Sequence, residues 1–332
     1  MARNHSKPRK AHAGADNPRR GTARPPRRAG AGRDGSGADG GPLWIWGTHA
    51  VVAALANPAR KCHELLATEN AAQRLPATGP IAPVLVTARD IDARLPEGAV
   101  HQGIAVKVDP LEAGALEDLI DAGISHIAVL DQVSDPHNLG AVYRSAAAFG
   151  FGGLVLQTRN APNVTGVAAK AAVGAIETVR EARVVNIARA LEQLGEAGYH
   201  TVGLAGEGKR LIADAVEGAQ KLAIVLGAEG PGIRPAVAKA CAELARIPIA
   251  PEMESLNVSN AFMKAAVNVS PCHKALLGIN HAVGKTDGAR TAMLRLLSII
   301  LLLCGLVAAG YAGSVLIDTY APRDEMVEAA TP

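Results

Sequence analysis

The feature of this sequence that most constrains its fold is the regular alternation of strand-like and helix-like segments over residues 124–262. Short apolar runs alternate there with amphipathic runs of helical period. The predicted strands cover residues 126–133, 153–157, 200–206, 221–229 and 245–250, and the predicted helices cover residues 139–150, 186–198 and 235–244. Because helices usually connect parallel strands, this order predicts an α/β domain whose parallel sheet carries helices on both faces.

A smaller α/β unit is predicted ahead of this domain, at residues 42–109. Thr48 is predicted to cap a helix that follows it, and residues 101–108 alternate in a way suited to a closing strand. Residues 110–123 are predicted to be a linker with a short helix. A chain of 332 residues has room for two such domains and for extensions at both ends.

Residues 1–41 are predicted to be a disordered basic tail. They contain ten Lys and Arg against three Asp, a net charge of +7 in a chain whose total is +3, so the remainder carries −4. With almost no large apolar side chains, the segment cannot offset the entropy lost on ordering. We interpret it as an arm that attracts RNA phosphates, and a solubilising tail is the alternative.

An apolar run at residues 296–317 lies inside the C-terminal extension, residues 263–332. It carries no charge and would be about 33 Å long as a helix, enough to cross a bilayer. Arg290 and Arg295 precede it and Asp318 follows, so a spanning helix would leave the part of the chain before it in the cytoplasm. A buried core helix is the alternative interpretation.

Composition limits the other chemistry that this chain is expected to use. The four cysteines form no C-x-x-C pair, which indicates reduced thiols in a cytoplasmic protein, without disulfides and without a metal site. Aromatic residues make up 3% of the chain, which argues against nucleic-acid recognition by base stacking on aromatic side chains.

Three polar or glycine-rich segments follow predicted strands, where ligands of parallel sheets bind. They are residues 131–150, 226–235 and 246–261. Asn138 and Arg144 lie near the start of a predicted helix, where they could surround an anion with its N-terminus. Glu229 lies in the glycine-rich segment, and Asn257 lies near the start of a helix that Ser255 is predicted to cap. Each segment alone is typical of an ordinary turn or helix cap.

Together, the three segments resemble the motifs of the SpoU (TrmH-type) branch of the SPOUT methyltransferases, in the family's order. The matching residues are Asn138, Gly140 and Arg144 in N-x-G-x-x-x-R, residues 227–230 in G-A-E-G, residues 247–249 in I-P-I, and residues 255–259 in S-L-N-V-S. The resemblance implies a sheet with a deep trefoil knot, a rare exception to unknotted topology. It also implies a homodimer that uses S-adenosylmethionine and no metal.

The same resemblance assigns the site residues. Contacts to the methyl donor fall on Gly227, Ile247 and Leu256, and catalytic roles fall on Asn138, Arg144, Glu229 and Asn257. In the family the arginine is a proposed proton acceptor, but an arginine side chain is almost always protonated. We therefore expect Arg144 to grip the phosphate beside the target ribose and to stabilise the developing alkoxide. His137 is the rival for the role of base.

The small unit resembles the L30e-like RNA-binding domain of bacterial 23S rRNA guanosine-2′-O-methyltransferases. The similarity rests on residues 46–55 and on His101, Gln102 and Gly103. It implies ribosomal RNA as the partner and methylation of a ribose 2′-hydroxyl as the reaction. The alternatives are a tRNA 2′-O-methyltransferase, a catalytically impaired RNA-binding or ribosome-assembly factor, and a membrane-anchored protein.

Overall fold

The computed structural model describes residues 41–76, 79–159, 161–250 and 255–269. Two of the predictions, the basic tail and the apolar run at residues 296–317, lie outside these residues, except for Gly41 at the end of the tail. Within the described ranges, no helix has both the length and the apolar character needed to cross a membrane.

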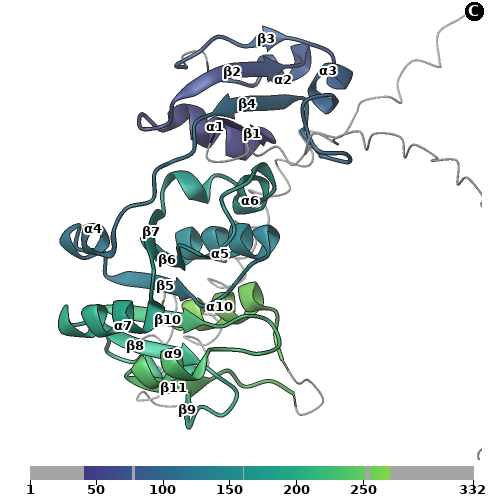
Figure 1. Ribbon diagram of the computed structural model, residues 1–332. Coiled ribbons are helices and arrows are strands. Elements are labelled where there is room, and N and C mark those ends of the chain that lie inside the picture. The colour runs from purple at the N-terminus through teal and green to yellow at the C-terminus, as the bar shows by residue number, and fades with distance from the viewer. Residues whose placement is uncertain (1–40, 77–78, 160, 251–254, 270–332) are drawn as a thin grey trace, which may run out of the picture. The chain divides into compact units, whose positions relative to one another are not determined.

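The larger domain is built on a seven-stranded sheet in the described part of the chain (Figure 1). The strand order is β7-β6-β5-β10-β8-β11-β9, and every pairing between neighbours is parallel. The strands are β5 (His126–Leu130), β6 (Gly153–Gln157), β7 (Arg180–Val184), β8 (His200–Leu204), β9 (Arg210–Leu211), β10 (Leu222–Leu226) and β11 (Glu243–Arg246). The predicted α/β fold with a parallel sheet is therefore confirmed.

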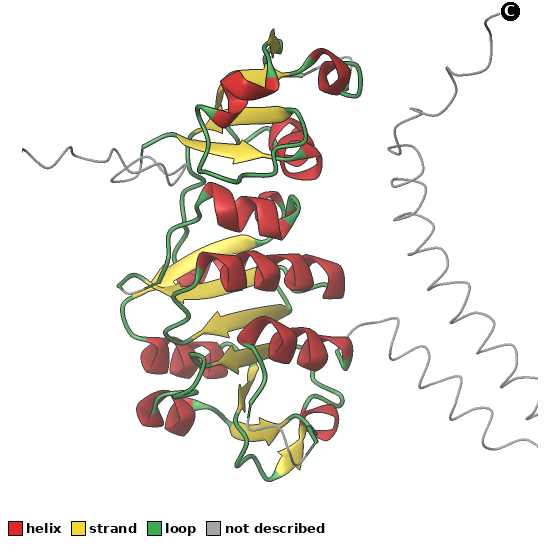
Figure 2. Ribbon diagram, turned by 90° about the vertical axis from the view of Figure 1, so that its right-hand side faces the viewer, coloured by secondary structure: helices red, strands yellow, loops and turns green. Residues whose placement is uncertain are grey.

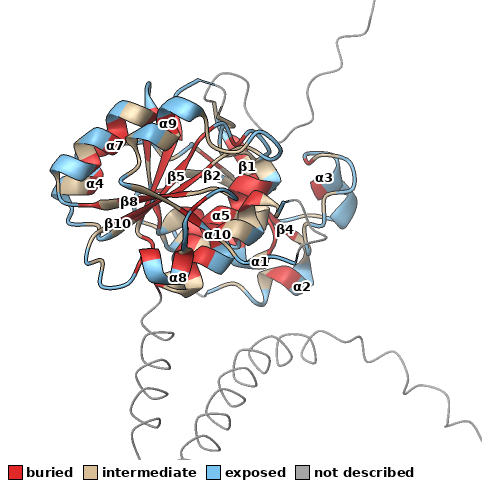
Figure 3. Cartoon of the chain, turned by 90° about the horizontal axis from the view of Figure 1, so that it is seen from below, coloured by how far each residue is buried: buried red, intermediate tan, exposed pale blue. Residues whose placement is uncertain are grey.

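Helices cover both faces of this sheet (Figure 2). They are α4 (Leu116–Asp121), α5 (Pro136–Phe149), α6 (Gly166–Ala172), α7 (Ile187–Glu196), α8 (Ile212–Ala215), α9 (Pro235–Ala240) and α10 (Val258–Val267), with a short 3-10 helix at Ala175–Glu177. Successive residues of β10 show the two layers: Leu222, Ile224 and Leu226 join the cluster under α5 and α10, whereas Ala223 and Val225 join the cluster under α7 and α9. The strands at the centre are accordingly buried on both sides (Figure 3).

The smaller domain contains a four-stranded sheet in the order β1-β4-β2-β3. Its elements are β1 (Leu43–Trp46), α1 (Thr48–Ala56), β2 (Cys62–Ala67), α2 (Glu69–Ala72), β3 (Val84–Leu85), α3 (Ala88–Asp92) and β4 (Ile104–Val108). Strand β4 is antiparallel to β1 and β2, and β3 is parallel to β2. A closing strand was predicted here and is present, while the L30e-like assignment stays a prediction.

Two helix boundaries differ from the sequence-based expectation. Thr48 does not cap α1, because Gly47 is the N-cap, with a φ of 87°. The backbone N–H of Thr48 donates a hydrogen bond to Gln102 Oε1 at 3.0 Å. The predicted helix at residues 235–244 ends at Ala240, because Glu243 begins strand β11 and pairs with β8. Pairing with a neighbouring strand overrode local helix propensity at this point.

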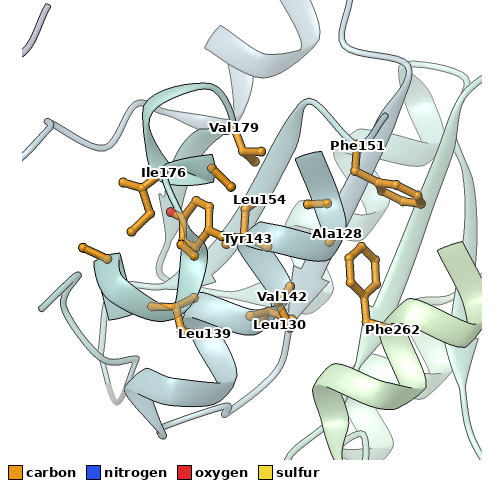
Figure 4. Packing of buried hydrophobic residues seen from close by; sticks show 14 of the residues in the cluster. Ala128, Leu130, Leu139, Val142, Tyr143, Phe151, Leu154, Ile176, Val179 and Phe262 are labelled. Atoms are coloured by element: carbon orange, nitrogen blue, oxygen red, sulfur yellow. The ribbon is translucent and has the colours of Figure 1, made fainter. Parts of the chain in front are cut away.

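Helix α10 is held against the large sheet by aromatic packing. The rings of Phe151 and Phe262 meet edge to face, with centroids 5.1 Å apart (Figure 4). Tyr143 of α5 is also buried, and its hydroxyl donates a hydrogen bond to Glu181. Burial raises the pKa of Tyr143 well above its usual value, and the nearby Glu181 carboxylate raises it further. These contacts fix α5 and α10, the two helices that carry the candidate site.

The trefoil knot stays a prediction. The segment at residues 251–254, which lies between β11 and α10, belongs to the part of the chain that the structure does not describe.

Candidate active site

A pocket of about 380 Å³ lies at the carboxyl ends of β8, β10 and β11. Three loops line it, together with the first turn of α10. The lining residues are 204–207, 226–233, Ala238, Ile247, Ile249, Ser255, Leu256, Val258 and Ala261. The position agrees with the general rule that parallel sheets bind ligands beyond the carboxyl ends of their strands.

The glycines of the central loop, residues 227–233, allow it to fold back on itself. A Cβ atom on Gly227 would lie 2.0 Å from the carbonyl carbon of Gly232, so only glycine fits there. The Gly232 N–H donates to the Ala228 oxygen at 3.0 Å, and Gly232 has a φ of 69°. The loop therefore presents much of its backbone to the pocket.

All three predicted donor-binding residues line this pocket. Gly227 comes from the loop after β10, Ile247 and Leu256 come from the connection between β11 and α10, and Glu229 joins them there. Among the described residues of the lining, two are charged, Glu207 and Glu229, and both are acidic. A positively charged ligand is therefore favoured over an anionic one.

Asn138 and Asn257 meet beside the pocket. Asn257 Nδ2 donates to Asn138 Oδ1 at 2.9 Å, although the two residues are 119 positions apart in the sequence. Asn257 is the N-cap of α10, and its Oδ1 accepts from the Ser259 N–H at 2.9 Å and from Ser259 Oγ at 2.6 Å. The predicted cap, Ser255, is wrong: it lies two residues earlier, in the pocket lining. Because Leu256 and Val258 both line the pocket, Asn257 places the asparagine pair at its border.

Arg144 lies apart from this pair, on an exposed part of α5. Arg144 comes six positions after Asn138, which places it about 120° around the helix from that residue. In the described residues no hydrogen bond or ion pair holds its guanidinium group or joins it to Glu229 or Asn257. His137 is also exposed, and its N–H donates to the Asp135 side chain. Arg144 is thus placed to meet a ligand that approaches from solvent.

A buried ion pair beside the pocket loop was not predicted from the sequence. The carboxylate of Asp131 is fully buried and accepts three hydrogen bonds from Arg234. The signal that could have revealed it is a charged residue directly after an apolar strand, since an acidic group is rarely buried without a partner.

No group of three or more His, Cys, Asp or Glu in the described ranges has the arrangement of a metal site. Cys62 and Cys241 are both free thiols. Burial, and to a smaller extent the charge of Asp131, raises the pKa of Cys241 to about 12.

This pKa predicts that Cys241 is unreactive in the folded protein. A raised pKa favours the neutral thiol, and the reactive thiolate is the rarer form at every pH below it. At pH 8 we expect iodoacetamide to alkylate Cys241 at least about 100-fold more slowly in the native protein than in the denatured one. Mass spectrometry of the peptide that contains Cys241 measures the two rates, and equal rates would contradict the assignment.

Two known protein families match the two parts of this chain. Residues 125–266 match the model of the SpoU rRNA methylase family, and residues 44–113 match a model described as RNA 2′-O ribose methyltransferase substrate binding. The larger domain belongs to the SpoU methylase family. The SpoU domain contains both the pocket and the asparagine pair, and the substrate-binding match contains the smaller sheet.

Curated relatives carry names that agree with the SpoU match. A protein named uncharacterized tRNA/rRNA methyltransferase, from Mycolicibacterium vanbaalenii, is 39% identical over 186 residues, which cover 54% of this chain and 59% of the relative. A protein of the same description from Synechocystis is 39% identical over 173 residues, covering 51% of this chain and 45% of the relative. The chain thus spans about half the length of the curated relatives that it matches.

This chain has the same fold as several solved structures. The SpoU methyltransferase AviRb from Streptomyces viridochromogenes, in complex with the cofactor AdoMet, superposes with a TM-score of 0.58 at 22% identity, covering 69% of this chain and 89% of that chain. An AdoMet-bound rRNA methyltransferase from Sinorhizobium meliloti gives a TM-score of 0.58 at 22% identity, covering 69% and 86%.

Proposed function

We propose that this protein transfers a methyl group from S-adenosylmethionine to a ribose 2′-hydroxyl of RNA, and that its substrate is a guanosine of 23S ribosomal RNA. One observation carries the proposal: the glycine-rich pocket is bordered by the Asn138–Asn257 pair, and both lie in a SpoU domain. A donor site and a set of polar side chains suited to orienting a ribose are thereby next to each other.

The residues that line the pocket, and their charge, are suited to S-adenosylmethionine. Gly227, Ile247 and Leu256 would hold the adenosine part through their backbone groups and apolar surface. The acidic residues Glu207 and Glu229 favour a cationic molecule over an anionic one. When bound, S-adenosylmethionine supplies the electrophilic methyl group.

The side chains around the pocket would then bring the ribose hydroxyl into line. Asn138 is fixed by Asn257, so its position is set before the substrate arrives. Arg144 stays cationic near neutral pH, and its exposed guanidinium group can grip an RNA phosphate in bidentate fashion. Once a bound phosphate holds it beside the target ribose, it would also stabilise the negative charge that develops on the attacking oxygen. Glu229 would orient the ribose or Arg144.

The smaller domain, residues 42–109, is proposed to recognise the RNA, and residues 124–262 are proposed to form the catalytic domain. The substrate-binding family match over residues 44–113 supports this division. We further propose that the protein acts as a homodimer, as the family resemblance implies.

A direct assay tests the reaction and the substrate. The purified full chain is incubated with methyl-labelled S-adenosylmethionine and either ribosomal RNA or tRNA from cells that lack this gene, and the RNA is digested to nucleosides. We expect label in 2′-O-methylguanosine from 23S rRNA. If label appeared only in tRNA, the substrate would be tRNA and the assignment to 23S rRNA would be wrong. Binding of RNA without any donor binding or transfer would instead show a non-catalytic RNA-binding factor.

A further inference from the structure

The buried ion pair between Asp131 and Arg234 lies outside the pocket lining but holds the pocket loop. Asp131 follows β5, and Arg234 is the N-cap residue of α9. The Asp131 side chain is 0% exposed, while the Arg234 side chain is 39% exposed. A carboxylate buried this completely is stable only when it is fully hydrogen-bonded to a partner of opposite charge.

The geometry of this pair meets that requirement. Asp131 Oδ1 accepts from Arg234 Nε at 2.9 Å and from Nη2 at 2.6 Å, while Oδ2 accepts from the Arg234 backbone N–H at 3.0 Å. Both side-chain donors of Arg234 converge on one carboxylate oxygen and the backbone N–H binds the other, so both oxygens are hydrogen-bonded, and the two side-chain contacts are of the stronger, charge-assisted kind.

Asp131 holds both ends of the loop at residues 227–233. Its backbone N–H donates to the oxygen of Leu226, the residue before the loop, at 2.8 Å. Its carboxylate binds Arg234, the residue after the loop. A single residue therefore closes this glycine-rich segment into a ring, within which Gly232 is hydrogen-bonded back to Ala228.

The same residue begins the segment that leads to the asparagine pair. Gln132 directly follows Asp131 with a φ of 61°, a left-handed conformation that is uncommon for residues other than glycine. Helix α5 starts at Pro136 and carries Asn138. Asp131 is thus the point where the pocket loop and the segment that carries Asn138 are tied together.

We propose that Asp131 and Arg234 are positioning residues, which hold the donor-binding loop in its binding-competent shape before the donor arrives. The inference rests on the proposed function, since it takes S-adenosylmethionine as the ligand of the pocket. A loop that is already ordered loses less conformational entropy when it binds a ligand, so the pair strengthens binding without touching the ligand. RNA binding, which uses other surfaces, does not depend on it.

Three variants of the full chain test the proposal. Arg234→Lys keeps the charge but loses the paired Nε and Nη2 donors. Arg234→Gln leaves the buried carboxylate without its charge partner and is the variant at risk of misfolding. The double variant Asp131→Asn with Arg234→Gln removes both charges, so no unpaired buried charge remains. The matched control is Arg183→Gln, which breaks another partly buried arginine–carboxylate pair on β7, at the far edge of the same sheet.

Two measurements read the result. Calorimetry with S-adenosylmethionine is expected to show a Kd about tenfold higher for the double variant and an intermediate value for Arg234→Lys, while Arg183→Gln stays within about twofold of the parent. Hydrogen exchange without any ligand is expected to show faster exchange at residues 227–233 in the double variant, a smaller increase in Arg234→Lys and no change in Arg183→Gln. The Kd for ribosomal RNA should not change in any of them.

The two readouts separate failure of this inference from failure of the proposed function. If the parent protein bound no S-adenosylmethionine but the loop exchanged faster in the double variant, the proposed function would fall and the role of the pair in ordering the loop would stand. If the folded double variant bound the donor as the parent does, with unchanged exchange at the loop, the positioning role would be overturned. Equal weakening by Arg183→Gln would also overturn it, because a general loss of stability would then explain the effect.

Discussion

Replacing Arg144 by alanine is expected to lower the kcat for methyl transfer to RNA by about 100-fold or more, while the protein stays folded. Arg144 is exposed on α5, and among the described residues nothing holds its guanidinium group, so its loss removes no packing. Alanine also has a high helix propensity, which preserves α5. Steady-state kinetics with labelled donor measure the loss, and circular dichroism with thermal melting checks the fold.

Two further variants accompany this experiment, one as a control and one to separate the charge of Arg144 from its geometry. Arg189→Ala removes another exposed arginine, on α7, and should leave kcat within about twofold because surface substitutions are usually mild. Arg144→Lys should fall between the parent and alanine, since lysine keeps the charge but loses the planar fork. Undiminished transfer by Arg144→Ala would remove Arg144 from the mechanism, and His137 would then be the next candidate.

Gly227→Ala is expected to weaken the binding of S-adenosylmethionine by on the order of 100-fold, because a displacement of about 1 Å in a binding loop can have an effect of that size. The new Cβ would lie 2.0 Å from the Gly232 carbonyl carbon and 2.2 Å from the Ile233 nitrogen. Both are backbone atoms, so the loop has to open. Calorimetry with the purified full chain measures the change in Kd.

Gly195→Ala is the matched control for this substitution. Gly195 lies in α7, where an added Cβ meets nothing within 4 Å. We expect unchanged donor binding and equal or slightly higher stability, since alanine restricts the unfolded chain. Donor binding by Gly227→Ala that equals the parent's would show that the folded-back loop is not needed for the ligand.

The larger fold followed from the sequence because its signals are local and repeated. The runs at residues 127–130, 154–156 and 222–226 are apolar throughout, as expected for strands buried on both faces, and all three lie in strands. Boundaries were harder to predict: α9 ends at Ala240, and Gly47 rather than Thr48 caps α1. Both depend on partners distant in the sequence, β8 and Gln102, which local propensity does not register.

The candidate site was predictable only in part, for the same reason. The asparagines and the glycine-rich loop were found because they occur together as short motifs, which are recognisable in the sequence without any distance in the folded protein. The Asp131–Arg234 pair was missed because its partners are 103 positions apart and, although both lie in the polar segments singled out from the sequence, neither is one of the motif residues. The cap of α10 was assigned to Ser255 since serine is a common N-cap, but the structure gives that role to Asn257, which also binds Asn138.

A crystal structure of the full chain with sinefungin, a stable analogue of S-adenosylmethionine, tests the central claim most directly. We predict that the adenosine part lies between residues 204–207, the loop at residues 227–233 and Leu256, with the amine that takes the place of the transferred methyl group facing Asn138 and Asn257. Electron density for the analogue at another place, or in this pocket with that amine facing away from the two asparagines, would contradict the account.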